Sequence, residues 1–222
     1  MFGIRTALGF NGRQSSQPKK GTCIMERIIN NTEAKDNSGK RYATLLIDPP
    51  WDIMQKGAFG AIQHYNLMSL ERIKAMPIKE LAADNSHCWL WVTNNTLRSG
   101  FDVLEEWGFT PRSVFTWVKL RMGLGTYLRN CTEHILFGTR GRAPVRCKNQ
   151  INFGVFPLQD HSHKPEEIHK IIERVSPPDY LELFARRRQL GWDVWGNEIE
   201  SDIVIPGYPV PQYSDKVPKW EV

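Results

Sequence analysis

The sequence predicts an α/β protein: one Rossmann-like domain built on a mostly parallel, doubly wound sheet. From residue 41 onward, segments with strand character alternate with segments of helical character, which is typical of such a sheet. The first apolar run, Leu45–Ile47, ends abruptly at Asp48-Pro49-Pro50-Trp51. This pattern indicates a buried strand whose carboxyl end opens into a rigid loop, and open α/β sheets bind their ligands at such ends.

Length and composition favour a single packed domain without a metal or membrane role. The chain has 222 residues, 41% of them hydrophobic, with no apolar run of membrane-spanning length and no signal-peptide core, so we expect a soluble, cytoplasmic protein. The net charge of +5 is compatible with a polyanionic partner without proving one. No zinc knuckle, other metal site or disulfide framework is expected, because the cysteines are widely spaced: Cys23, Cys88, Cys131 and Cys147.

Three regions are expected along the chain. Residues 1–40 carry few large apolar side chains and are predicted to form a partly ordered extension. Residues 41–204 form the domain. Residues 205–222 are rich in proline, which predicts a tail without fixed secondary structure.

In the first part of the domain, Ser69 is a good helix N-cap and Pro77 restarts a helical segment towards Leu81. A further helix is expected from Thr96 to Trp107, with Gly108 as its stop. The connection over residues 52–66 is long and without periodicity, which is typical of a functional or mobile loop. Further strands are expected at His87–Val92, Ser113–Val118 and Thr132–Phe137.

The last part of the domain is predicted to contain one helix and two strands. The helix opens at His163–Ile168, where Pro165 suits the first helical position, and it buries Ile168, Ile171, Ile172 and Val175. It ends at Ser176-Pro177-Pro178. The segment Tyr180–Arg186 is expected to be a strand, and Gly191–Glu198 a final short strand and turn.

Residues 48–51, which follow the first strand, combine hydrogen-bond acceptors with an aromatic ring. Asp48 is an acceptor-only carboxylate, and the two prolines offer carbonyl groups without neighbouring N–H donors. Trp51 adds a broad π face. Such a set suits a planar ring that bears an amino group, for example adenine. The alternative is structural: Asp-Pro commonly starts a turn, and the tryptophan then anchors the core.

Two loops are rich in cations. One spans residues 119–130 and contains Lys119, Arg121 and Arg129, and the other contains Arg140, Arg142, Arg146 and Lys148. If both lie at one sheet edge, they form a groove for backbone phosphates; alternatively, they are ordinary solvated surface. The Gly-x-Gly pair at Gly123 and Gly125 is too weak to indicate a phosphate site.

Three later stretches, in a fixed order, extend the pattern begun by Asp48-Pro49-Pro50-Trp51: Thr132-Glu133-His134, Ser162-His163-Lys164-Pro165, and Glu182-Leu183-Phe184-Ala185-Arg186 followed by Gly191-Trp192 and Gly196-Asn197-Glu198. Over residues 41–203 the chain resembles the MT-A70 family of S-adenosylmethionine-dependent adenine N6-methyltransferases, in particular its small bacterial and phage-type members. The resemblance implies a Rossmann-like class I methyltransferase fold.

The resemblance also implies roles for individual residues. Asp48, Pro49, Pro50 and Trp51 would form the catalytic motif, with Asp48 and Pro49 on the adenine amino group and Trp51 stacked near the base. Tyr65 would belong to the loop that closes over the target. Packing roles are the alternative for Trp51 and Tyr65. His134 and His163 are interpreted as structural histidines without a catalytic role, and Glu133 is expected at most to order the neighbouring basic loop.

The cofactor, S-adenosyl-L-methionine, would be bound by residues from the later stretches. Asp48 would also lie near its amino acid end, Lys164 would meet its carboxylate, and Phe184 would border its adenosine. The ribose would contact Arg186, Gln189, Asn197 and Glu198. The chain departs from the family's eukaryotic members at Arg188-Gln189, where they have His-Asn, and at Glu198, where they have Gln. Without the motif, Lys164 would be an ordinary exposed lysine and Phe184 a core residue.

The resulting hypothesis is methyl transfer to N6 of adenine in nucleic acid, with DNA preferred and RNA as the alternative. Lys119, Arg121, Arg129 and Arg142 would bind the substrate together with Trp51 and Tyr65. A homodimer, or a heterodimer with a related subunit, is expected. The rival hypothesis is a non-catalytic subunit that binds nucleic acid or an active partner.

Overall fold

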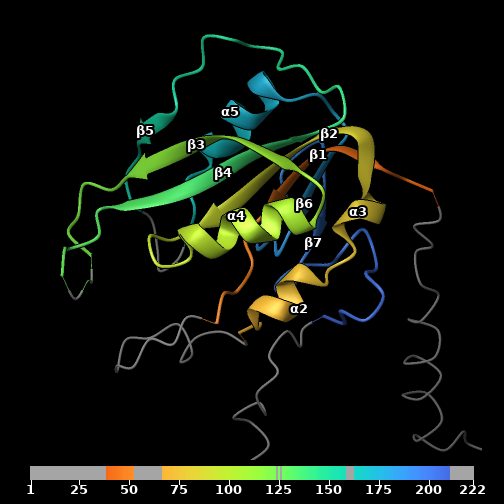
Figure 1. Ribbon diagram of the computed structural model, residues 1–222, viewed down its shortest axis with the longest axis horizontal. Coiled ribbons are helices and arrows are strands. Elements are labelled where there is room, and N and C mark those ends of the chain that lie inside the picture. Colours follow the sequence, from red (N-terminus) through yellow and green to blue (C-terminus); the bar gives the residue numbers. More distant parts are fainter. Residues whose placement is uncertain (1–38, 53–66, 124, 126, 159–162, 211–222) are drawn as a thin grey trace, which may run out of the picture. The chain divides into compact units, whose positions relative to one another are not determined.

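The computed structural model describes residues 39–52, 67–123, 125, 127–158 and 163–210, and these contain one seven-stranded sheet with the order β5-β3-β4-β2-β1-β6-β7 (Figure 1). The strands are β1 Tyr42–Ile47, β2 Ala82–Val92, β3 Thr110–Val118, β4 Thr132–Arg140, β5 Phe153–Val155, β6 Tyr180–Leu183 and β7 Trp192–Trp195. The helices are α2 Leu70–Lys74, α3 Ile78–Leu81, α4 Leu97–Glu106 and α5 Glu167–Val175.

The sheet confirms the predicted mostly parallel arrangement. β1 runs parallel to β2 on one side and to β6 on the other, and the pairs β6–β7 and β3–β5 are parallel too. β4 is the exception, since it runs antiparallel to both β2 and β3. The carboxyl ends of β1, β2, β3 and β6 therefore lie at one edge of the sheet, next to the beginning of β4.

Two hydrophobic layers, one on each face of the sheet, confirm the doubly wound prediction. Leu45 and Ile47 of β1 belong to a core cluster that includes Ile73 of α2, Ile78 of α3 and Leu104 of α4. The layer on the other face contains Leu46 of β1 and the buried side of α5, namely Ile168, Ile172 and Val175. Figure 1 shows α2, α3 and α4 on one side of the sheet and α5 on the other. β1 is therefore covered by apolar groups on both faces.

Local signals at the helix ends behave largely as expected. Ser69 accepts a hydrogen bond from the backbone N–H of Arg72 and caps α2, and Gly108, with a φ of 81°, follows the end of α4. α5 begins at Glu167, so the prediction of Pro165 as its first helical residue is wrong. Pro165 lies before the helix, where its carbonyl accepts a hydrogen bond from Ile168 N–H.

Four strand predictions were wrong in length. β3 begins at Thr110, three residues before Ser113, and β4 continues to Arg140, three residues beyond Phe137. β2 begins at Ala82, five residues before His87, because the polar residues Asp84 and Asn85 occupy an exposed part of the same strand. The segment Tyr180–Arg186 is a strand only as far as Leu183. Phe184 has a φ of 64°, in the left-handed region, and this conformation ends the pairing.

The described part of the proline-rich segment, residues 205–210, contains no helix or strand, yet it is packed against the domain. Ile205 and Tyr208 are buried, and the Tyr208 hydroxyl donates a hydrogen bond of 2.7 Å to the carbonyl of Arg72. Among the helices that the structure describes, none has the length and apolar character needed to cross a membrane.

Candidate active site

Asp48 stands directly after β1, at the sheet edge where the parallel strands end. Its backbone N–H donates to the carbonyl of Leu183 at the end of β6. The turn that follows is closed by backbone hydrogen bonds: Pro49 carbonyl accepts from Trp51 N–H, and Pro50 carbonyl accepts from Met68 N–H at 2.8 Å. Pro49 and Pro50 therefore form a fixed turn. Each of their carbonyl oxygens keeps a second lone pair that can accept a further hydrogen bond.

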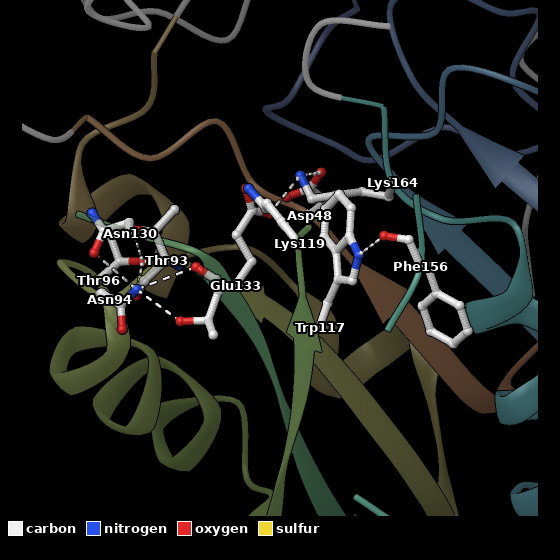
Figure 2. Close-up of polar contacts among 11 residues, drawn as sticks. Asp48, Thr93, Asn94, Thr96, Trp117, Lys119, Asn130, Glu133, Phe156 and Lys164 are labelled. Atoms are coloured by element: carbon white, nitrogen blue, oxygen red, sulfur yellow. Dashed lines mark hydrogen bonds and ion pairs between the residues drawn. The ribbon is translucent and has the colours of Figure 1, made fainter. Parts of the chain in front are cut away.

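An ion network surrounds Asp48 (Figure 2). The Lys164 ammonium lies 2.7 Å from Asp48 Oδ2 and 3.7 Å from Glu133 Oε2, and Lys119 binds the other oxygen of Glu133. Lys164 also lies over the ring of Trp91, 5.1 Å from its centroid. Two carboxylates and two ammonium groups are thus brought together from the residues directly after β1 and β3, from β4 and from the segment before α5.

The charges within the network shift the pKa values of Lys164 and Glu133. Burial by itself lowers the pKa of Lys164, but the negative charges of Asp48 and Glu133 and the hydrogen bond to Asp48 outweigh it, so the pKa is raised. Burial likewise raises the pKa of Glu133, and the charges and hydrogen bonds of Lys164 and Lys119 reverse this, so the net pKa is lowered. Both residues are therefore charged at neutral pH.

The network borders a cavity of about 390 Å³. Of the seven residues predicted to bind the cofactor, six line this cavity: Asp48, Lys164, Phe184, Arg186, Gln189 and Glu198. The seventh, Asn197, is exposed directly before Glu198. Residues that lie far apart in the sequence are thus gathered around one hollow that opens beside the carboxyl ends of β1 and β6.

The far wall of the cavity depends on a tight backbone contact. Phe184 leaves β6 in the left-handed region and packs edge-to-face on Trp195, with ring centroids 5.2 Å apart. The N–H of Ala185 donates to the carbonyl of Trp195, and a Cβ on Gly196 would lie only 2.0 Å from the Ala185 carbonyl oxygen. Residue 196 must therefore be glycine, because a residue with a Cβ could not approach so closely. The close approach places Asn197 and Glu198 beside Arg186, which lies 3.5 Å from Glu198.

Trp51 occupies the packing position that sequence reasoning gave as the alternative. Its side chain is only 9% exposed, it belongs to the core cluster with Met68, and its indole N–H donates to the carbonyl of Trp91 at 3.1 Å. The broad face predicted to be open to a base is covered in this structure. Tyr65 lies outside the described residues.

The two basic loops do not share an edge, so that expectation is wrong. Because β4 is antiparallel to its neighbours, the loop with Lys119, Arg121 and Arg129 precedes it at the Asp48 edge, and Arg142 follows it at the opposite edge. There the Arg142 backbone N–H donates to the side chain of Asn85, near the beginning of β2. Lys119 is bound to Glu133, while Arg121 and Arg129 are exposed.

Two acidic residues that were not predicted to bind substrate or cofactor belong to the ion network and the cavity wall: Glu133, expected at most to order the neighbouring basic loop, and Glu182. Glu133 holds both lysines of the ion network, and it was part of the Thr132-Glu133-His134 motif, which was the available signal. Glu182 lines the cavity and its carboxylate lies 2.8 Å from His169 Nε2 on α5. Its signal was the alternation of polar and apolar residues along β6.

Comparisons with known proteins match the same region. A family model described as MT-A70 matches residues 42–198. The chain is 30% identical over 191 residues to the N(6)-adenosine-methyltransferase MT-A70-like protein of Drosophila melanogaster, covering 80% of this chain and 30% of that protein. The human N(6)-adenosine-methyltransferase catalytic subunit METTL3 is 28% identical, with 80% and 32% covered.

A third relative has a length closer to that of this chain. The type II methyltransferase M.MunI of Mycoplasma sp is 29% identical over 196 residues, which cover 75% of this chain and 82% of that enzyme. The chain therefore spans less than a third of the Drosophila and human proteins but most of this one.

Proposed function

The chain belongs to the MT-A70 family, and from this premise we propose that it transfers a methyl group from S-adenosyl-L-methionine to N6 of adenine in nucleic acid. The observation that carries the proposal is the Asp48–Lys164 ion pair at the mouth of the cavity. It joins the residue proposed to hold the adenine amine to a residue proposed to hold the cofactor, 2.7 Å apart.

The groups around the cavity fit this cofactor. Its carboxylate needs a cation, which Lys164 supplies, and its ammonium group needs a carboxylate, which Asp48 supplies. Its ribose hydroxyls need acceptors, and Glu198 and Gln189 offer them. Its adenine needs an apolar plane, and Phe184 is half-buried at the wall. When bound, the cofactor supplies an electrophilic methyl group on a sulfonium.

Adenine N6 is a weak nucleophile because its lone pair is delocalised into the ring. Lys164 binds Asp48 Oδ2, so we assign Oδ1 as the oxygen that accepts one amine hydrogen. The Pro49 carbonyl accepts the other hydrogen through its second lone pair. Held at both hydrogens, the nitrogen becomes more pyramidal, and the Asp48 charge offsets the positive charge that appears on it during the reaction. A proton lost afterwards can pass to solvent.

A base paired in a duplex must leave the stack to reach Asp48, at a cost of a few kcal/mol. DNA is the substrate that we favour, because the relative matched over most of its length is the type II methyltransferase. The N(6)-adenosine-methyltransferases are matched over about 30% of their length, and RNA is the alternative that they support. The name of the human relative contains "subunit", so we further propose that this chain works with a second copy or a related chain.

The test is direct. The chain is incubated with methyl-labelled cofactor and separate DNA and RNA pools, and the digested nucleosides are separated. We expect label in N6-methyldeoxyadenosine from the DNA pool. Label in the ribonucleoside alone would move the substrate to RNA. If neither nucleoside carries label while calorimetry shows no cofactor binding, the chain is a non-catalytic subunit.

A further inference from the structure

The loop between β3 and β4, residues 119–131, presents large apolar side chains to solvent. Tyr127 is 99% exposed, and Leu128 and Leu120 are 83% and 81% exposed. Met122 is also exposed. An exposed apolar cluster of this kind marks an interaction surface, since burying it in a partner is favourable and leaving it in water is not. Leu124 and Thr126 lie outside the described residues.

Backbone hydrogen bonds connect the two ends of this loop. Lys119 N–H donates to the Cys131 carbonyl at 2.7 Å, and Gly123 N–H donates to the Asn130 carbonyl at 3.0 Å. A Cβ on Gly125 would lie 1.9 Å from the Leu128 carbonyl oxygen, so the chain passes very close to itself here. Figure 1 shows the loop projecting beyond the ends of β3 and β4. The described residues at the two ends of the loop are therefore held close together.

The projection begins at the ion network of the active site. Lys119, its first residue, binds Glu133, which in turn pairs with Lys164 beside Asp48 (Figure 2). At its other end, Asn130 accepts a hydrogen bond from the side chain of Asn94, which follows β2. The loop and Asp48 consequently share one sheet edge, and a molecule bound at Asp48 can extend onto the loop.

The charge of the loop indicates the chemistry of its partner. Residues 119–131 contain three cations and no carboxylate. Arg121 lies between Leu120 and Met122, and Arg129 follows Leu128, so exposed arginines flank the exposed apolar side chains. Phosphates bind arginine while bases stack on aromatic and apolar side chains, so this alternation matches a nucleic acid strand.

We propose that Tyr127 and Leu128 form a wedge that enters the base stack beside the target adenine, while Arg121 and Arg129 bind the flanking phosphates. The inference rests on the proposed function and deepens it. By occupying the space that a flipped adenine leaves, the wedge lowers the cost of taking the base out of a duplex. The substrate class assigned by this loop is therefore double-stranded nucleic acid.

The experiment compares methyl transfer to one adenine-containing DNA pool, supplied as single strands and as duplexes, under single-turnover conditions. The Tyr127→Ala, Leu128→Ala double variant should lose about tenfold more rate on duplexes than on single strands, because only a paired base must be taken out of the stack before methyl transfer. Tyr127→Phe should retain the duplex rate. Ile151→Ala, which removes an apolar side chain 61% exposed outside this loop, is the matched control and should change neither rate.

Each other result overturns the wedge. Equal losses on the two substrates, or no loss, would show that the loop does not open the stack. A fall in activity on both substrates together with a change from dimer to monomer in sedimentation would identify a protein interface instead. A wild-type chain active on single strands alone would remove the need for a wedge and leave the proposed function intact. A wild-type chain inactive on both pools would remove the proposed function itself.

Discussion

Lys164 lies 2.7 Å from Asp48, although 116 residues separate them in the sequence. The pair joins the loop after β1 to the segment before α5, and Glu133 holds the same ammonium from β4. Three segments of the chain therefore depend on one another for the geometry at the cavity mouth.

Asp48→Asn should abolish methyl transfer, because the amide keeps the shape of the side chain but loses the charge that the amine and Lys164 require. We expect a loss of at least about a hundredfold in single-turnover rate, in the range seen when one electrostatic catalytic group is removed. Circular dichroism should show an unchanged fold. Turnover near the wild-type rate in this variant would refute the catalytic role of Asp48.

Lys164→Ala should mainly weaken cofactor binding. The variant loses a charge-assisted hydrogen bond to the cofactor carboxylate and leaves Asp48 and Glu133 without their shared cation, so we expect an affinity loss of about ten- to a hundredfold. Isothermal titration calorimetry measures it. Arg98→Ala is the control, since that exposed cation on α4 pairs with Asp102 and does not line the cavity. An unchanged affinity in Lys164→Ala would remove Lys164 from the cofactor site.

Trp51→Phe distinguishes packing from base stacking. Phenylalanine keeps an aromatic face but cannot donate to the carbonyl of Trp91, so we expect a loss of about 1 kcal/mol in the free energy of unfolding. If Trp51 only positions the loop, the affinity for an adenine-containing strand should stay within about twofold. A much larger fall in affinity without a change in stability would assign the ring to the substrate.

Gly196→Ala should be severely destabilising, because the added Cβ would lie 2.0 Å from the Ala185 carbonyl oxygen and the backbone would have to move apart. We expect a loss of more than about 3 kcal/mol or an insoluble protein. Gly191→Ala is the matched control: its φ of 82° strains alanine, but no atom lies within 4 Å of the new Cβ. That variant should lose only about 1 kcal/mol. Similar urea midpoints for both would contradict the clash.

His87 predicts a dependence of stability on pH. The ring is fully buried, with Nε2 2.8 Å from the Ala143 carbonyl and Nδ1 2.8 Å from Ser176 Oγ. A carbonyl only accepts, so Nε2 carries the hydrogen and Nδ1 accepts from the serine hydroxyl. Burial lowers the pKa of His87, although the hydrogen bond to Ala143 opposes the shift.

The lowered pKa of His87 determines whether stability rises or falls with pH. Below a pH of about 6.5 the unfolded chain binds a proton at His87 while the folded chain stays neutral, so stability falls as the pH falls. The slope for one site is at most about 1.4 kcal/mol per pH unit. His87→Gln should reduce the difference between urea midpoints at pH 7.5 and 5.5. Part of the slope should remain, because burial also lowers the pKa of His134. An unaltered difference would mean that His87 does not titrate this way.

Much of the fold follows from local patterns in the sequence. The apolar run before Asp48, the cap at Ser69 and the stop at Gly108 each act within a few residues, and each lies where it was expected. The end of β6 was missed because Phe184 adopts a backbone conformation that its residue type does not signal. Edge-to-face packing on Trp195, which is distant in sequence from β6, accompanies it.

Site residues were predicted only where they belong to a recognisable sequence motif. Asp48 and Lys164 were named together through a family resemblance, and no local rule would have placed them in contact. The direction of β4 was not readable from residues 132–140, so Arg142 was grouped with Arg121 and Arg129 although it lies at the other sheet edge. The contact of Glu133 with Lys164 was missed for the same reason, since it depends on which strands surround Glu133.

The position of β1 also has a consequence for biosynthesis. Among the strands that the structure describes it comes first in chain order, yet one of its two neighbours is β6, whose residues 180–183 are made much later. One side of β1 therefore waits without its hydrogen-bonding partner while the ribosome completes the intervening segments. Such a strand is open to pairing with other nascent chains. Recombinant yield should accordingly improve when chaperones that bind the nascent chain are supplied.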